Sequence, residues 1–442
     1  MNNELASPWS FARAGQSRAV RSSVALIGNG ALLVLLGCGV LIAVASAAGA
    51  SFLVATPPGR FPAWITGPLG GLGNPIGRPG FLTVMLFMWV AYAAVIAASS
   101  RVRRVLALSV VVALHVVFLL APPLLSTDIF SYLDYARLGA VHGLNPYLHT
   151  PIAAPHDAVY SLVGPKWDHT RTAYGPLFTL LSYPLAHLSL PNAVWALKTL
   201  ATLASLACVG LVWRCARLRG RDPLRPALLV GLNPLLLVYA VGGGHNDLLM
   251  MGLMVGAVAL ASQRESVASG LVVAAATVKL SAGVVLPFML VGARRPRQVL
   301  AGAAVALALA AAVSALAFDW HAWRFLGVVR EQQELIGPQS FPIQVAHLFG
   351  LGGPATVMAI AHVALATTAL ALLAAVRRGA DWVAASGWML LAVVVATSFL
   401  LPWYTVWALP LAAISADRRL IAASLFIELL FFVHQLGPLV AA

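Results

Sequence analysis

The segment Val24–Ala48, VALIGNGALLVLLGCGVLIAVASAA, consists almost entirely of apolar and small residues. At 1.5 Å per residue, a helix of this length exceeds the ~30 Å hydrocarbon core of a lipid bilayer. It follows a short stretch that contains Arg13, Arg18 and Arg21, and its apolar part is too long for a typical signal peptide. We therefore predict an uncleaved first transmembrane helix, with residues 1–23 in the cytoplasm.

Similar apolar runs recur along the whole chain. Of the 442 residues, 60% are hydrophobic and 10% are charged, and the mean hydropathy is +0.88, which excludes a soluble globular protein. The sequence predicts an all-α polytopic membrane protein, in which residues 24–442 form a single membrane domain. The predicted spans are about 24–47, 81–99, 105–122, 193–213, 226–241, 248–262, 298–317, 354–376, 382–400 and 404–436, the last one split by Asp417, Arg418 and Arg419.

The net charge of +14 does not indicate nucleic-acid binding, because the arginines gather in short loops between the apolar runs. Such loops face the cytoplasm and contact anionic lipid head groups. We therefore expect membrane lipids as partners and no nucleic acid. The clusters are Arg101–Arg104, Arg214–Arg225, Arg294–Arg297, Arg377–Arg378 and Arg418–Arg419.

Two segments are too interrupted or too short to cross the bilayer. Residues 174–190 are interrupted by Pro176, Pro184 and His187, and the charge of the loop that follows 193–213 favours a shallow return here. Residues 267–279 and 280–293 are each too short for a span, so we predict an up-and-down hairpin with Lys279 near its tip. With this topology the two main loops, 122–172 and 318–353, lie outside the cell.

The first external loop begins with STDIFSYLDYARLGAVHGLNPY at 126–147. As a helix along the membrane surface, this sequence places Asp128, Tyr132 and Tyr135 on one face and residues such as Ile129 on the side that faces lipid. A carboxylate is then held at the bilayer surface next to aromatic rings.

Such a carboxylate can take a proton from a sugar hydroxyl while that hydroxyl attacks an activated lipid-linked donor. The alternative is that Ser126 or Thr127 caps the helix and Asp128 only complements its dipole. We predict the catalytic role, because ionisable residues near membrane depth are usually functional. For Asp134, a functional role and a local ion pair with Arg137 both fit the sequence.

A second polar element, GGGHND at Gly242–Asp247, precedes a helix that begins near the outer surface. Its glycines allow a ligand close to the backbone, and the positive end of the helix can face a phosphate beside His245. The alternative is a glycine turn with Asn246 or Asp247 as the helix cap and His245 at the surface. We predict a functional role for His245.

Lys279 lies in the apolar sequence AATVKLSAG, where an unpaired ammonium is costly. A lipid phosphate would pair with it, whereas snorkelling to the membrane surface is the alternative. Arg171 and Arg330 are further candidates for phosphate binding, although ordinary loop arginines have the same pattern. Trp403 and Tyr404 can stack on sugar rings or belong to an interfacial aromatic belt.

No nucleotide-binding motif of the P-loop or G-x-G-x-x-G type is present, so an energy-rich donor has to arrive within the membrane. Cys38, Cys208 and Cys215 have no paired spacing, so no disulfide framework or zinc site is expected. We expect no cofactor and no metal ligands.

Five segments together resemble the polyprenyl-phosphate-mannose-dependent α-1,6-mannosyltransferases of actinobacteria, members of the GT-C class of integral membrane glycosyltransferases. The segments are DIFSYLDYARLGAVHGLNPY (128–147), TAYGPLF (172–178), NPLLLVYAVGGGHNDLLMMGL (233–253), ATVKLSAG (276–283) and LPWYTVWALPLAA (401–413). The resemblance implies a GT-C-type bundle of about 10–13 transmembrane helices with extracytoplasmic loops. It also implies a full membrane crossing that starts near Tyr174.

The resemblance further implies an inverting enzyme that moves mannose from a polyprenyl-phosphate donor to a lipid-anchored mannan acceptor at the external face of the cell membrane. Asp128 matches the acidic general base of the first external loop, and Ile129 follows it where some GT-C members have a second Asp, so no metal is implied. Lys279 and His245 would stabilise the departing phosphate. The expected substrate-binding residues are Tyr132, Asp134, Tyr135, Asn145, Tyr174, Asn246, Asp247, Trp403 and Tyr404.

Two other functions stay open at this point. A transporter or flippase of a lipid-linked sugar would use the same acids and Lys279 for binding alone, and a lipid-linked polymer ligase would transfer preassembled chains. Transporters commonly show matching halves with broken helices. Here the polar residues gather on one face, which favours an enzyme.

Overall fold

A computed structural model of the chain describes residues 8–56, 61–165, 167–337 and 339–440. These residues form helices and loops without a β-strand, which confirms the predicted all-α polytopic membrane fold. Five of the described helices are long and apolar enough to cross a membrane: α1 (Pro8–Ser46, apolar over Ser22–Ser46), α2 (Arg78–Ala97), α7 (Leu190–Leu218), α12 (Pro296–Phe318) and α15 (Pro354–Arg377).

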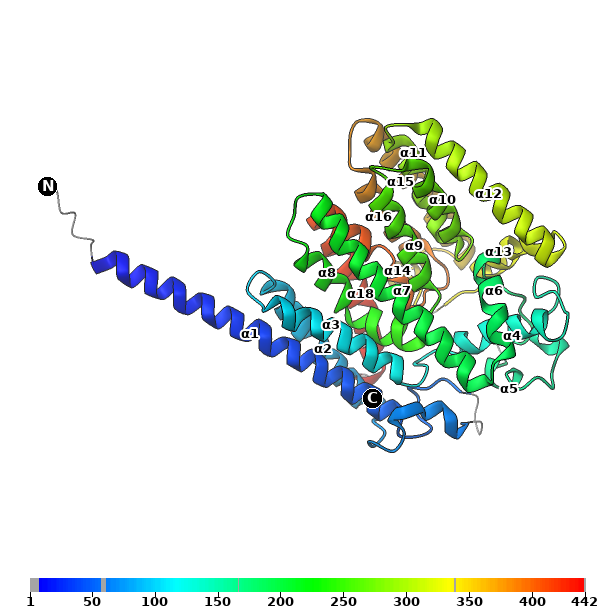
Figure 1. The fold of residues 1–442 in the computed structure, drawn as a ribbon, viewed down its shortest axis with the longest axis horizontal. Helices are drawn as coiled ribbons and strands as arrows, with labels where there is room; N and C mark the ends of the chain where they lie inside the picture. Colours follow the sequence, from blue (N-terminus) through cyan, green and yellow to red (C-terminus); the bar gives the residue numbers. More distant parts are fainter. Residues whose placement is uncertain (1–7, 57–60, 166, 338, 441–442) are drawn as a thin grey trace.

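Further apolar helices pack between these five (Figure 1). α1 lies against α2 and α3, α7 packs on α9, and α10 lies between α9 and α12. The helices of this set are α3 (Arg104–Leu120), α8 (Leu224–Gly231), α9 (Asp247–Leu260), α10 (Glu265–Ala276), α11 (Val285–Gly292), α16 (Trp382–Ala396), α17 (Leu409–Ser415) and α18 (Arg418–Val440).

The chain between α9 and α12 turns back on itself, as the sequence predicts. α10 forms the first arm, the short 3-10 helix η5 (Leu280–Val284) follows at the tip, and α11 returns as the second arm. The two ends of this hairpin meet, because the Glu265 carboxylate accepts hydrogen bonds from the backbone nitrogens of Arg294 and Arg295, each at 2.8 Å. Lys279 therefore lies at the hairpin tip.

The predicted cytoplasmic arginine clusters gather at one end of the bundle. Arg104 pairs with Asp222 at 3.3 Å, and Arg219 pairs with Asp381 at 2.6 Å. These pairs join loops that are far apart in the sequence. The 14 residues of α9 lead from the opposite end to the base of the hairpin, a distance of about 21 Å. The arginine clusters and the start of α9 therefore lie at opposite ends of the bundle.

The remaining helices cover the end of the bundle opposite the arginine clusters (Figure 1). α6 and η3 are too short to cross a bilayer, so the structure has the shallow return predicted at 174–190, and α7 makes the crossing instead. The α-helices here are α4 (Asp128–Ala140), α5 (Tyr160–Val163), α6 (Pro176–Ser182), α13 (Phe325–Glu334) and α14 (Phe341–Phe349). The short turns are η1 (Ala63–Leu69), η2 (Pro151–Ala153), η3 (Tyr183–His187), the π-helical η4 (Leu236–Val241), η6 (His321–Arg324) and η7 (Pro402–Tyr404).

One prediction about α4 is wrong. Ile129, Leu133 and Ala136 do not face lipid, because all three have no exposed surface. η3, α5, α6 and α7 pack around α4 and enclose it. The residues that follow α4 in the chain fold back over it, and the periodicity of a single helix cannot show such a cover.

Candidate active site

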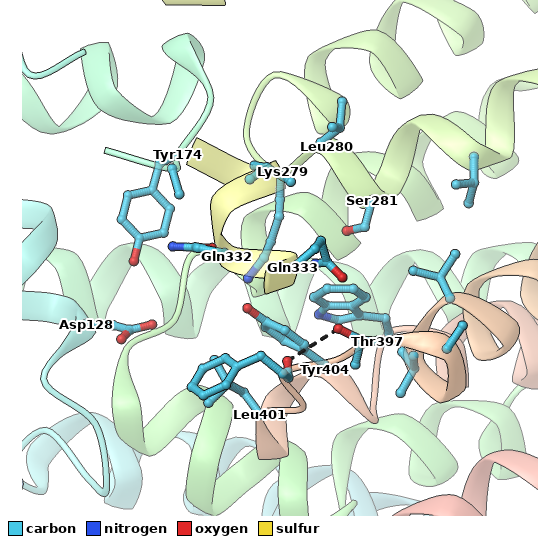
Figure 2. Close-up of a pocket in the computed structure, with 18 of the residues that line it drawn as sticks. Asp128, Tyr174, Lys279, Leu280, Ser281, Gln332, Gln333, Thr397, Leu401 and Tyr404 are labelled. Atoms are coloured by element: carbon cyan, nitrogen blue, oxygen red, sulfur yellow. Dashed lines mark hydrogen bonds between the residues drawn. The ribbon is translucent and has the colours of Figure 1, made fainter. Parts of the chain in front are cut away.

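A cavity of about 330 Å³ opens among α4, the hairpin tip, α13, α15 and α16. In Figure 2, Asp128 and Tyr174 lie on one side of it, Thr397 and Tyr404 lie on another, and the Lys279 side chain extends between them. The other polar residues of the lining include Ser131, Tyr135, Thr170, Ser281, Gln332 and Gln333. An apolar wall contains Val284, Leu365, Val393, Val394 and Leu401.

Asp128 is the first residue of α4, so its carboxylate lies at the positive end of the helix dipole. Its backbone N–H donates to Ser126 Oγ at 3.1 Å, whereas Thr127, the N-cap residue, makes no side-chain capping bond. The Asp128 side chain keeps 18% of its surface exposed, toward the cavity. The carboxylate can therefore reach a ligand while its backbone is fixed.

His245 lies directly behind Asp128 and has no exposed surface. Its Nδ1 lies 3.4 Å from Asp128 Oδ2, and its ring stacks on Trp403 with centroids 3.6 Å apart. The turn that carries it contains Gly244 at φ +72°, a conformation that glycine adopts without strain. Buried in this way, His245 orients Asp128 and presents no atom to the cavity. Among the described residues, no group of three His, Cys, Asp or Glu side chains is placed to hold a metal ion.

The charges around Asp128 determine its protonation. Burial raises the pKa of this carboxyl, but the hydrogen bond from His245, the charges of His245 and Lys279 and the hydrogen bond from Ser126 together lower it below its ordinary value. Asp128 is consequently an ionised carboxylate at neutral pH, which is the form that a general base requires.

Lys279 projects from the hairpin tip, where its backbone is extended (φ −148°, ψ 122°) between α10 and η5. Its Nζ donates to Asp247 Oδ1 at 2.7 Å and lies 4.4 Å from the ring centroid of Tyr404 and 5.1 Å from that of Trp407. Asp247 is fully buried and also accepts from Trp407 Nε1 at 2.7 Å. The ammonium thus has a carboxylate partner and two aromatic faces, and it does not snorkel to the surface.

Two backbone hydrogen bonds join the start of α6 to the hairpin tip. Gly175 N donates to Val278 O and Leu177 N donates to Thr277 O, each at 3.2 Å. A Cβ atom on Gly175 would lie 2.1 Å from Thr277 O, so only glycine allows this approach. The start of α6 therefore sets the place of Lys279.

Three predicted tyrosines pack next to Asp128. The Tyr174 ring meets the Tyr132 ring edge to face, with centroids 4.7 Å apart, and Tyr174 and Tyr135 both line the cavity. The Tyr135 hydroxyl donates to Thr170 O at 2.8 Å. Tyr132 is buried, and its hydroxyl donates to Asn246 Oδ1 at 3.3 Å rather than reaching the cavity. Asn246 is the N-cap residue of α9 but makes no side-chain capping bond.

Several predicted residues lie outside the cavity lining. Asn145 Nδ2 donates to Phe318 O at 2.8 Å, which ties the first loop to the end of α12. Arg171 pairs with Glu331 at 3.0 Å, and this bond joins the first loop to α13. Arg330 is exposed on α13, and Trp403 is buried behind His245.

Of the two possibilities that the sequence left open for Asp134, the ion pair with Arg137 is not formed. Arg137 Nε donates to both oxygens of Asp157, at 2.8 and 3.0 Å. Asp134 is only 1% exposed, and its Oδ2 has no hydrogen-bond partner among the described residues. Burial, and then the nearby Asp157 charge, raise the pKa of Asp134 to about 7. Asp157 lies 20 residues further along the chain, which helix spacing cannot reveal.

The sequence also did not reveal several residues of the site. Gln332 and Gln333 of α13 reach the cavity from the second external loop, but glutamines in a polar loop carry no distinct signal (Figure 2). Trp407 could not be singled out either, because it lies within an apolar run. Lys198 of α7, in contrast, is an ionisable residue inside an apolar span, a signal that does point to a role.

Two family models match the chain. The model described as "Alpha-(1->6)-mannopyranosyltransferase, N-terminal domain" matches residues 32–295. The model described as "Glycosyltransferase family 87" matches residues 172–432. The matched ranges contain Asp128, His245 and Lys279 in the first case and His245, Lys279 and Tyr404 in the second.

Individual relatives agree with these matches. Alpha-(1->6)-mannopyranosyltransferase A of Mycobacterium tuberculosis is 32% identical over 77% of this chain and 71% of that protein. A probable alpha-(1->6)-mannopyranosyltransferase of Mycolicibacterium smegmatis is 40% identical over 31% of this chain and 25% of that protein. Alpha-(1->6)-mannopyranosyltransferase A of Corynebacterium glutamicum is 25% identical over 53% of each chain. No solved structure matches the chain.

Proposed function

The chain belongs to the actinobacterial α-(1→6)-mannopyranosyltransferase family, and from this premise we propose that it moves mannose from a polyprenyl-phosphate donor to a lipid-anchored mannan acceptor. The new linkage is α-(1→6) and the anomeric carbon is inverted. The active site faces the outside of the cell membrane, and residues 24–442 act as a single membrane domain.

The observation that carries this proposal is that Asp128 and Lys279 line one cavity at the end of the bundle away from the arginine clusters. Asp128 accepts the proton of the acceptor hydroxyl, whose oxygen attacks the anomeric carbon of mannose. The bond between that carbon and the phosphate oxygen breaks, and the phosphate keeps the electron pair. Lys279 lies where it can balance the charge that grows on the phosphate.

The apolar wall supports a lipid-linked donor. Val284, Leu365 and Val393 line the cavity from the hairpin, α15 and α16. An isoprenoid chain could lie there while its phosphate meets Lys279 and its sugar meets Asp128. Holding both reactants in this way contributes much of the rate, because it removes the entropy cost of bringing them together.

The other predicted residues take supporting roles in this proposal. Tyr135, Tyr174 and Tyr404 line the sugar site, and Asp247 holds Lys279 in place. His245 acts through Asp128 rather than on the phosphate, since it has no exposed surface. Arg171 and Arg330 lie on the rim, where they could meet a phosphate or the acceptor. The buried or peripheral members of the set are Tyr132, Asp134, Asn145, Asn246 and Trp403.

Purified protein in liposomes tests this function. With polyprenyl-phosphate mannose labelled in the sugar and a synthetic alkyl α-1,6-dimannoside as acceptor, we expect the label in a trisaccharide together with free polyprenyl phosphate. The anomeric configuration of the new bond distinguishes inversion from retention. Movement of intact donor across the bilayer without release of phosphate would instead identify a transporter, and transfer of preassembled chains alone would identify a polymer ligase.

A further inference from the structure

Lys198 is fully buried in the third turn of α7, yet the described residues give its ammonium no carboxylate partner. Its Nζ instead donates to two backbone carbonyls, Gly242 O at 2.7 Å and Pro122 O at 3.2 Å. A buried ammonium without a counter-charge is disfavoured relative to an apolar side chain. An apolar residue at this position would therefore stabilise the fold more than lysine does, which indicates that the two hydrogen bonds of Lys198 serve a function.

The two carbonyls belong to the two segments that bring the acid–histidine pair together. Pro122 lies in the connection from α3 to α4, which leads to Asp128. Gly242 begins the glycine turn that leads to His245. The ammonium therefore bridges these segments just before each reaches the cavity.

The glycine turn fits closely against the same lysine. A Cβ atom on Gly244 would lie 3.2 Å from Lys198 Cγ and 2.9 Å from Ile129 Cδ1, and Ile129 is the neighbour of Asp128. The turn at Gly244, the Lys198 side chain and the first turn of α4 therefore pack closely against one another. The Asp128 to His245 distance, 3.4 Å, is already at the long end for a hydrogen bond, so a small displacement breaks it.

We propose that Lys198 is a positioning residue for the transfer reaction. By binding the Pro122 and Gly242 carbonyls, it fixes the position of Asp128 relative to His245. This inference rests on the proposed function. It gives Lys198 no contact with donor or acceptor, since its side chain has no exposed surface.

The test compares Lys198→Met, Lys198→Arg and wild type in the transfer assay with labelled polyprenyl-phosphate mannose. Methionine keeps the length of the side chain and removes the donors. Loss of positioning lowers kcat about tenfold to a hundredfold and leaves the KM for the donor within about twofold. Arginine keeps the charge and the donors and restores part of kcat. The matched control on the same helix is Thr202→Val, which keeps wild-type kcat because its buried hydroxyl has no partner among the described residues.

A double variant separates positioning from general stability. If Lys198 acts through the acid–histidine pair, Lys198→Met lowers kcat less than about threefold in a His245→Phe background, whereas independent effects multiply. Wild-type kcat in folded Lys198→Met, or multiplying effects, overturns the inference. If Lys198→Met does not yield folded protein, Lys198→Arg decides alone: a lower kcat at unchanged KM supports positioning, and unchanged kcat contradicts it. Absence of transfer by the wild type refutes the proposed function instead.

Discussion

The ammonium of Lys279 lies 2.7 Å from Oδ1 of Asp247, a carboxylate with no exposed surface. The cation at the hairpin tip thus has a buried counter-ion, which belongs to the glycine turn and lies on another helix. This pair joins the two elements that the sequence singles out, and it makes separate predictions for stability and for activity.

We expect Asp247→Asn to destabilise the protein by about 3 kcal/mol, the low end for a broken buried pair, because Lys279 keeps 17% of its side-chain surface exposed. The double variant Asp247→Asn/Lys279→Met leaves no unpaired charge and should regain most of the wild-type Tm without regaining mannose transfer. Thermal unfolding and the transfer assay measure the two effects. A wild-type Tm for Asp247→Asn would show that the pair does not hold the hairpin tip.

His245→Phe should move the acid limb of kcat/KM to higher pH. The hydrogen bond from His245 lowers the pKa of Asp128, so its loss raises that pKa. The reaction needs the ionised Asp128 carboxylate, so activity falls as pH drops through the pKa of Asp128. Because this pKa is higher in the variant, its activity falls at a higher pH than that of the wild type. Phenylalanine keeps a ring against Trp403, and His347→Phe on the exposed face of α14 serves as the control. An unchanged acid limb would contradict the role given to His245.

Asp134→Asn should change how stability depends on pH. The folded pKa of Asp134 is raised to about 7, so between about pH 4 and pH 7 the folded protein binds a proton that the unfolded chain has lost. Wild-type stability therefore falls as pH rises through this window. The amide of the variant does not titrate, so its stability does not fall in this way. Between pH 5 and pH 8 we expect the free energy of unfolding of the variant to rise by about 2 kcal/mol relative to that of the wild type. Parallel curves of Tm against pH for the two proteins would refute this.

Gly175→Ala should disturb the hairpin tip directly. The new Cβ would meet the Thr277 carbonyl at 2.1 Å, and a backbone atom cannot give way as a side chain can. We expect a loss of about 1–3 kcal/mol in stability together with a lower kcat, because Lys279 moves with the tip. Gly210→Ala on α7 is the matched control, since a Cβ there meets nothing within 4 Å and an alanine favours the helix. Equal activity of the two variants would rule out the coupling.

The sequence predicted the all-α membrane fold because it follows from local composition. The hairpin at 267–293 was accessible for the same reason, since two apolar runs too short to cross have to turn back. The predicted hairpin placed Lys279 at its tip, and the structure confirms this position.

Pairings between distant segments were not accessible. Asp247 was expected to meet substrate or cap a helix, and it binds Lys279, which lies 32 residues away. An ion pair with the acid three residues before it was one possibility for Arg137, and it binds Asp157 instead. His245 was expected at a phosphate, and burial places it behind Asp128. In each case a single sequence supplies the residue type, while the partner depends on packing.

The most direct test of the central claim compares wild type with Asp128→Asn, both purified with equal Tm, in the transfer of labelled mannose from polyprenyl-phosphate mannose. Asp319→Asn, an exposed acid at the end of α12, controls for loss of a negative charge. If Asp128 is the general base, kcat falls about 10²- to 10⁴-fold in Asp128→Asn and is unchanged in Asp319→Asn. Wild-type kcat in Asp128→Asn would contradict the account.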